Sequence, residues 1–278
     1  MSFINELMFA LNRPLQFLGG HSSRYSALKK KASSLAKDKN FYEQALQEIS
    51  EYTKEGVETV KQRYADLKKQ TDEMSFSQKE EEAILRFYRN DRHYIYELPL
   101  WNSQCGRPYL LSWIAKPYLE RHHYRHILDF GSGAGDLGIA LRQAGFHVTC
   151  FDINPSLVEF AKWRFQRRGL NIDFIDQSLK DGQLFDCIMA FDVFEHLKNL
   201  PEKIKRLRRN LHKGGSLIFN IEEGDGKDGL HLNENMIYRD AWQVHRMLTL
   251  AGFSFAWKFK RFYFYTASPE NCELRKAV

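Results

Sequence analysis

A glycine-rich turn is the feature of this sequence with the clearest chemistry. Residues 131–135 read Gly-Ser-Gly-Ala-Gly and directly follow a short apolar run at residues 126–130. Glycine allows a sharp turn and lets a ligand approach the backbone without a Cβ clash. A helix that begins after such a turn also offers unpaired N–H groups. The turn therefore predicts a nucleotide-like ligand, although several classes of nucleotide-binding enzyme share this feature.

Two carboxylates near the turn narrow the choice of ligand. Asp129 stands two residues before Gly131, where it suits an ammonium group and would repel a pyrophosphate. Asp152 follows the next apolar run, residues 147–151, where a carboxylate can accept hydrogen bonds from both ribose hydroxyls. The glycine spacing is GxGxG, whereas dinucleotide sites use GxGxxG. These residues together indicate a nucleoside that carries an amino acid.

Apolar runs alternate with helical patterns after residue 120 and predict the elements that position the turn. This alternation indicates βαβ units and a mainly parallel sheet with helices on both faces. Lys213-Gly214-Gly215 is predicted to form the turn into the fifth strand. The predicted strands cover residues 126–130, 147–151, 172–175, 185–191, 216–221, 254–257 and 262–266.

The first hundred residues read as helices. Apolar residues recur at helical spacing from Phe41 to Leu67, with an interruption at Gly56, and a second helix is predicted at residues 77–89. An apolar segment at residues 3–18 is predicted to pack on its own domain, since its polar face has too few Lys or Arg residues for a membrane-surface helix.

The run from His126 to Ile221 resembles the core of the class I S-adenosylmethionine (SAM)-dependent methyltransferases. It is similar to the branch that includes ubiquinone and menaquinone biosynthesis methyltransferases and many small-molecule enzymes. Residues 127–135 (Ile-Leu-Asp-Phe-Gly-Ser-Gly-Ala-Gly), Asp152, and residues 185–197, which end in Asp-Val-Phe-Glu-His-Leu, carry the resemblance. The turn at residues 211–215 and the helix end at 248–253 extend it.

The resemblance implies a fold, a domain division and a cofactor. The fold is α/β, a Rossmann-like seven-stranded, mainly parallel sheet of order 3-2-1-4-5-7-6 whose last strand is antiparallel, with an N-terminal helical extension. Residues 1–100 would form the extension or lid, and residues 101–278 the SAM-binding methyltransferase domain. The turn and the resemblance together assign cofactor contacts to Asp129, Gly131, Ser132, Gly133, Gly135, Asp152, Ile153, Asp176 and Asp192.

Two histidines are candidates for a catalytic base. His196 follows the fourth predicted strand, where an open sheet presents its ligand crevice, and a histidine near neutral pH suits proton transfer. The alternative is that Glu195-His196 orders the adjacent loop. His231 follows the fifth strand and is either a base or a residue at a helix start that Asn233 caps.

Aromatic residues before the core are candidates for the acceptor pocket. Tyr94, Tyr96 and Trp101 can line a lid over the substrate or pack between the extension and the sheet. A basic stretch at residues 203–209 suggests contact with nucleic acid, but a solvated outer helix is the simpler interpretation.

Composition excludes several classes of protein. The net charge of +6 permits an acidic partner without demanding one. The four cysteines show no CxxC spacing, so no zinc site or disulfide framework is indicated. We expect reduced thiols in a cytoplasmic protein. No apolar run is long enough to span a bilayer, and the N-terminal segment does not read as a signal peptide.

Four functions compete at this point. The favoured one is methyl transfer from SAM to an oxygen or nitrogen of a small-molecule acceptor. The others are an RNA or protein methyltransferase that docks through its extension, a non-catalytic SAM-binding scaffold, and a nicotinamide-dependent oxidoreductase. The sequence identifies neither the acceptor nor the oligomeric state.

Overall fold

The computed structural model describes most of the chain. The described residues are 20–73, 86, 88–90, 92–175, 178–180, 182–221 and 240–268. The predicted segment 3–18, Asp176 and His231 lie outside them. Of the helix predicted at 77–89, only residues 86, 88 and 89 are described, and these are helical.

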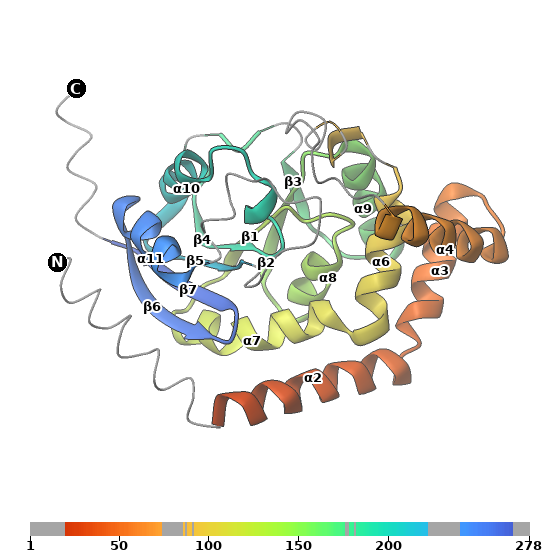
Figure 1. Cartoon of the computed structure of the whole chain (residues 1–278), viewed down its shortest axis with the longest axis horizontal. Coiled ribbons are helices and arrows are strands. Elements are labelled where there is room, and N and C mark those ends of the chain that lie inside the picture. Colours follow the sequence, from red (N-terminus) through yellow and green to blue (C-terminus); the bar gives the residue numbers. More distant parts are fainter. Residues whose placement is uncertain are drawn as a thin grey trace.

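The centre of the molecule is a seven-stranded sheet of order β3-β2-β1-β4-β5-β7-β6 (Figure 1). Strand β7 runs antiparallel to both of its neighbours, and the other neighbouring pairs are parallel. The predicted strand order and the antiparallel last strand are confirmed. The strands are β1 (His126–Phe130), β2 (His147–Phe151), β3 (Asp173–Ile175), β4 (Phe185–Ala190), β5 (Leu211–Asn220), β6 (Phe253–Phe259) and β7 (Phe262–Ala267).

The predicted turn at Lys213-Gly214-Gly215 is wrong, because these residues lie inside β5. The pairing of β5 with β4 shifts register between Leu211 and Ser216, so the segment between them bulges out of the ladder. Gly214 has φ 78°, a conformation that glycine adopts without strain. The glycines thus shape a bulge in a longer strand.

Alternate residues of the strands pack on opposite faces of the sheet. Leu128 and Ile188 join the core under α10 (Leu200–Arg209) and α11 (Ala241–Leu250). Ile127 and Cys187 join the core under α7 (Arg107–Arg121) and α8 (Asp136–Gln143). The strands are buried on both faces, as a parallel sheet requires.

The N-terminal extension consists of helices that precede the sheet in the sequence. They are α2 (Gly20–Asp38), α3 (Phe41–Thr53), α4 (Val57–Glu73) and α6 (Tyr94–Cys105). The apolar stripe predicted from Phe41 to Leu67 is two helices, because Lys54 is left-handed (φ 60°) and ends α3. Helix α6 runs without a break through residue 100, so the domain division there stays a prediction.

The extension shares a hydrophobic core with the glycine-rich turn. Leu46 of α3 and Leu100 of α6 pack in one cluster with Ala134 of the turn and Phe160 of α9 (Pro155–Arg167). Figure 1 shows α3, α4 and α6 gathered at the end of the molecule where α9 lies. The extension therefore packs directly against the glycine-rich turn.

Within the described ranges, none of the helices combines the length and the apolar character that a membrane span requires.

Candidate cofactor and acceptor site

A cavity of about 330 Å³ opens at the carboxyl ends of β1, β2 and β4. The chain leaves β1 for β2 on one side and reaches β4 on the other, and this reversal is where open α/β sheets bind ligands. Residues of α6 and α7, among them Leu98, Trp101 and Arg107, cover the cavity. Its lining includes all the predicted cofactor residues within the described ranges except Gly135.

The glycine-rich turn is held in a conformation that needs glycine. Gly131, Gly133 and Gly135 have φ of 76°, 53° and 80°. A Cβ on Gly131 would lie 2.4 Å from Val193 Cγ2, and one on Gly135 would lie 2.5 Å from Phe165 Cζ. Gly135 therefore serves helix packing and not the cavity wall.

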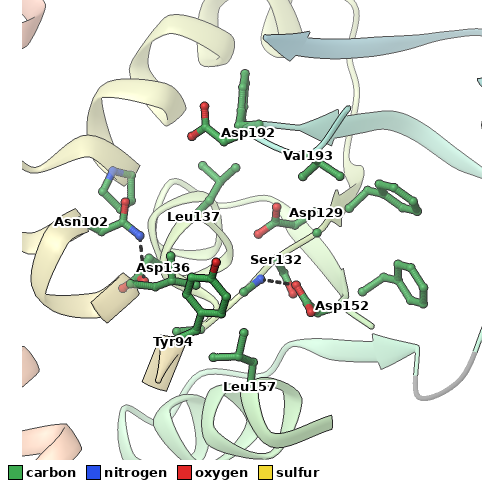
Figure 2. Close-up of a pocket in the computed structure, with 18 of the residues that line it drawn as sticks. Tyr94, Asn102, Asp129, Ser132, Asp136, Leu137, Asp152, Leu157, Asp192 and Val193 are labelled. Atoms are coloured by element: carbon green, nitrogen blue, oxygen red, sulfur yellow. Dashed lines mark hydrogen bonds between the residues drawn. The ribbon is translucent and has the colours of Figure 1, made fainter. Parts of the chain in front are cut away.

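Backbone hydrogen bonds fix the turn to strand β2. The N–H groups of Gly131 and Ser132 both donate to the carbonyl of Phe151, at 2.8 and 3.0 Å. The Gly133 N–H donates to Asp152 Oδ2 at 2.8 Å (Figure 2). The turn is thus preorganised before any ligand arrives.

Asp129 is a buried carboxylate on the cavity wall. It is 3% exposed, and among the described residues its Oδ2 atom has no hydrogen-bond partner. Burial, reinforced by the nearby charge of Asp152, raises the pKa of Asp129 to about 7, although the Gly138 backbone N–H opposes this rise. A cationic group in the cavity would supply the missing partner and restore the ionised form.

Asp152 lies on the other side of the turn, with Ser132 between the two carboxylates in Figure 2. Its Oδ1 accepts from the Asn154 N–H at 2.9 Å, and Oδ2 accepts from Gly133. Burial raises the pKa of Asp152 above its usual value, and the hydrogen bonds from these backbone N–H groups limit the rise. An ionised carboxylate has about four acceptor positions, so two can still serve a ribose diol. The neighbouring Ile153 is 44% exposed and lines the cavity.

Asp192 is paired with two residues of this chain, Arg107 and Asn220, and the sequence did not predict either contact. Its Oδ2 forms an ion pair with Arg107 Nη2, and its Oδ1 accepts from Asn220 Nδ2 at 2.6 Å. The Asp192 N–H also donates to Asn220 Oδ1 at 2.8 Å. Arg107 lies 4.9 Å from the centre of the Trp101 ring. Asp192 therefore shapes the cavity together with Arg107.

His196 lines the cavity and contacts Tyr88, which precedes helix α6 in the sequence. Its Nδ1 is 3.0 Å from Tyr88 Oη, and the two rings are 4.7 Å apart. Tyr88 also stacks on Tyr94 with ring centres 5.8 Å apart, and both tyrosines line the cavity. The helical pattern at residues 77–89 predicted that Tyr88 faces inward, but it assigned Tyr88 no role in the site. Tyr96 turns away and donates to Glu55 Oε2 at 3.0 Å.

The residues present fit SAM. Asp129 offers the ammonium a carboxylate oxygen, Oδ2, that has no partner among the described residues, and Asp152 offers acceptors for the ribose hydroxyls. A Cβ on Gly133 would narrow the space beside Leu98. A pyrophosphate would meet two carboxylates instead of donors. Within the described ranges, no cluster of His, Cys, Asp and Glu could hold a metal ion.

The sheet order and the carboxylate-flanked glycine turn define the class I SAM-dependent methyltransferases. Residues 59–254 match the family described as "Methyltransferase domain", and the chain belongs to this family. SAM, the cofactor expected from the sequence, is the cofactor of the class.

Curated relatives match the chain over part of its length. The ubiquinone biosynthesis O-methyltransferase of Coxiella burnetii (strain Dugway 5J108-111) is 32% identical over 129 residues, which cover 43% of this chain and 55% of that protein. The enzyme of the same name from Rickettsia prowazekii is 32% identical over 96 residues, covering 34% of this chain and 38% of the relative. The chain thus spans about half the length, or less, of these relatives.

Solved structures of methyltransferases are also similar. The magnesium protoporphyrin IX methyltransferase of Synechocystis PCC 6803 with bound SAM is 19% identical, with a TM-score of 0.47 and coverage of 69% of this chain and 99% of that one. A SAM-dependent methyltransferase from Clostridium acetobutylicum is 21% identical, with a TM-score of 0.38 over 42% of this chain and 50% of that one. Likenesses at this level say nothing about the acceptor.

Proposed function

We propose that this chain transfers a methyl group from SAM to an oxygen or nitrogen of a small-molecule acceptor. One observation carries the proposal: two carboxylates flank a preorganised glycine turn in a single cavity, and one of them, Asp129, has an unpartnered oxygen. This arrangement complements a nucleoside with an amino-acid group.

The chain's own residues would hold the cofactor in defined roles. Asp129 binds the ammonium, Asp152 the ribose hydroxyls, and the turn at Ser132 and Gly133 packs against the nucleoside. Ile153 covers the cofactor from the cavity wall. Asp176 stays a proposed cofactor contact from the sequence. When bound, SAM supplies a methyl group on a positively charged sulfur.

The rest of the cavity favours a mainly apolar acceptor. Its wall near β4 and α6 includes the apolar side chains of Leu98, Trp101, Val193 and Leu197, together with the polar Asn102, Asp192 and His196. Apolar walls exclude water and hold an acceptor atom in place, which can supply much of the rate of a displacement reaction. The curated relatives are named O-methyltransferases, so we propose a hydroxyl oxygen as the first acceptor to test.

His196 is the proposed base for such a hydroxyl. If its Nδ1–H donates to Tyr88 Oη, the lone pair lies on Nε2, which can take a proton. Burial raises the pKa of Tyr88 well above its usual range, so this hydroxyl keeps its proton and does not compete as a base. His231 stays a second candidate from the sequence.

A labelled-methyl transfer screen tests the proposal. The full chain is incubated with methyl-labelled SAM and with separated pools of small molecules, RNA and protein. We expect label in a small molecule, with loss of transfer in Asp152→Ala. Label in RNA or protein would show that the acceptor is a macromolecule and would refute the proposed small-molecule acceptor. Binding of SAM without transfer to any pool would support the scaffold alternative instead.

A further inference from the structure

A buried cluster of charges joins the helical extension to helix α9. Glu48 of α3 is fully buried. Its Oε2 lies 2.9 Å from Arg164 Nε, and its Oε1 lies 2.6 Å from Arg168 Nε. Burial alone would raise the pKa of Glu48, but the charges of Arg164 and Arg168 outweigh it and lower the pKa. Glu48 is therefore ionised and paired from two sides.

The same arginine reaches the glycine-rich turn. Arg164 Nη1 donates to the Ala134 carbonyl at 2.7 Å and lies 2.9 Å from Asp136 Oδ1. Asp136 is the first residue of α8, and its Oδ2 accepts from Asn102 Nδ2 at 3.2 Å (Figure 2). The guanidinium of Arg164 thus bridges α3, the turn and the start of α8.

Burial makes this bridge hard to replace. Arg164 is 2% exposed, so its charge depends on protein partners. Removing one partner of a buried ion pair leaves an uncompensated charge, which is strongly unfavourable. The guanidinium would then move toward its remaining partners, Ala134 and Asp136, and these belong to the turn.

We propose that Glu48 is a positioning residue for the cofactor: through Arg164 it holds the glycine-rich turn in its binding conformation. The extension thereby sets cofactor affinity although Glu48 does not line the cavity. The expected change in SAM affinity rests on the proposed function, but the effect of Glu48 on the turn can be measured without any ligand.

A neighbouring ion pair provides a matched control. Glu51 lies on the same helix and accepts from Arg167 Nε and Nη2 at 2.7 and 2.8 Å. Both side chains are partly exposed, at 51% and 35%. The described contacts of Arg167 reach Glu51, Glu48 and the Trp163 ring, and none reaches the turn.

The experiment compares Glu48→Gln, Glu51→Gln and the wild-type full chain by amide hydrogen exchange without ligand. In the wild type the N–H groups of Gly131, Ser132 and Gly135 are hydrogen-bonded, so their exchange reports on the turn. Arg164→Lys is a second variant if Glu48→Gln does not fold, because lysine keeps the charge but lacks the planar guanidinium fork that contacts Glu48, Ala134 and Asp136. Calorimetry with S-adenosylhomocysteine then measures the affinity of each protein.

We expect faster exchange at residues 131–136 in Glu48→Gln and Arg164→Lys, with exchange in β5 and β7 unchanged. The dissociation constant for S-adenosylhomocysteine should rise by about 2- to 30-fold, the range for residues that act from outside a site. Glu51→Gln should change neither. Unchanged exchange of the turn in a folded Glu48→Gln or Arg164→Lys protein would overturn the inference, as would an equal effect in Glu51→Gln. Faster exchange in a protein that binds no S-adenosylhomocysteine even as wild type would support the positioning of the turn and refute the proposed function.

Discussion

Replacing Asp129 with asparagine should stabilise the ligand-free protein at alkaline pH. The pKa of Asp129 is raised from 3.8 to about 7 by burial. Between these values the folded protein holds a proton that the unfolded chain has lost, so rising pH destabilises the fold. A shift of about 3 pKa units corresponds to roughly 4 kcal/mol, fully expressed above pH 7. Asparagine has the same shape and no charge, so Asp129→Asn avoids this cost.

The assay is urea unfolding, followed by circular dichroism, at several values from pH 4 to pH 8. We expect the free energy of unfolding of Asp129→Asn to increase relative to that of the wild type by roughly 1.4 kcal/mol per pH unit between about pH 4 and 7, which means that the variant becomes relatively more stable. Other ionisable groups are common to both proteins and cancel in the difference. Asp38→Asn, at an exposed position on α2, serves as a control that should show little pH-dependent difference.

The same substitution should weaken cofactor binding. Loss of a charged partner for the ammonium is expected to raise the dissociation constant for S-adenosylhomocysteine by roughly 10- to 150-fold at pH 8, the equivalent of about 1.5–3 kcal/mol. A stability difference that stays constant from pH 5 to pH 8 would refute the reasoning, because Asp129 would then be ionised and satisfied within the protein. Unchanged affinity would refute its assignment to the ammonium.

Three further substitutions test other parts of the site. Asp152→Ala should raise the dissociation constant for S-adenosylhomocysteine by roughly 10- to 150-fold in calorimetry, and unchanged affinity would remove it from the ribose contact. Gly131→Ala should lower the free energy of unfolding by about 1–3 kcal/mol, since φ is 76° and the new Cβ would lie 2.4 Å from Val193 Cγ2. Adding Val193→Ala should recover part of this loss of stability. An unchanged free energy of unfolding in Gly131→Ala would contradict the described turn. Tyr88→Phe should move the acidic limb of the pH–rate profile to lower pH, because a hydroxyl that accepts from Nδ1–H of His196 stabilises the protonated ring. A profile that does not move would exclude Tyr88 and His196 from proton transfer.

Local patterns predicted the sheet and the cofactor half of the site. The alternating apolar runs predicted a mainly parallel sheet, and the family resemblance implied its strand order; the order is confirmed. Asp129, Gly131 and Asp152 lie close to the ends of β1 and β2 in sequence, so a short stretch of chain brings them together. Their place in the cavity needed no long-range information.

The supporting contacts could not be predicted, because they join distant parts of the chain. Glu48 and Arg164 are 116 residues apart, and Arg107 and Asp192 are 85 apart. No local motif joins the members of either pair. Glu48 and Arg164 each read alone as a solvated helix charge, and Asp192 read as a cofactor contact. Tertiary packing decides that Glu48 is buried, and a single sequence carries no signal for it.

The two errors in element boundaries have a shared physical origin. The break at Lys54 and the bulge at Gly214 both depend on single residues with positive φ. At Lys54 the apolar pattern continues on both sides of the break, so periodicity alone does not mark it. At Gly214 the paired glycines indicated a turn, although the strand continues through them.

The central claim is that two carboxylates and a glycine turn hold an amino-acid-bearing nucleoside. Calorimetric titration of the wild-type full chain with S-adenosylhomocysteine and, separately, with NADH at pH 8 tests it most directly. The account predicts saturable binding of S-adenosylhomocysteine with one site per chain and no binding of NADH. Binding of NADH, or no binding of S-adenosylhomocysteine, would contradict it.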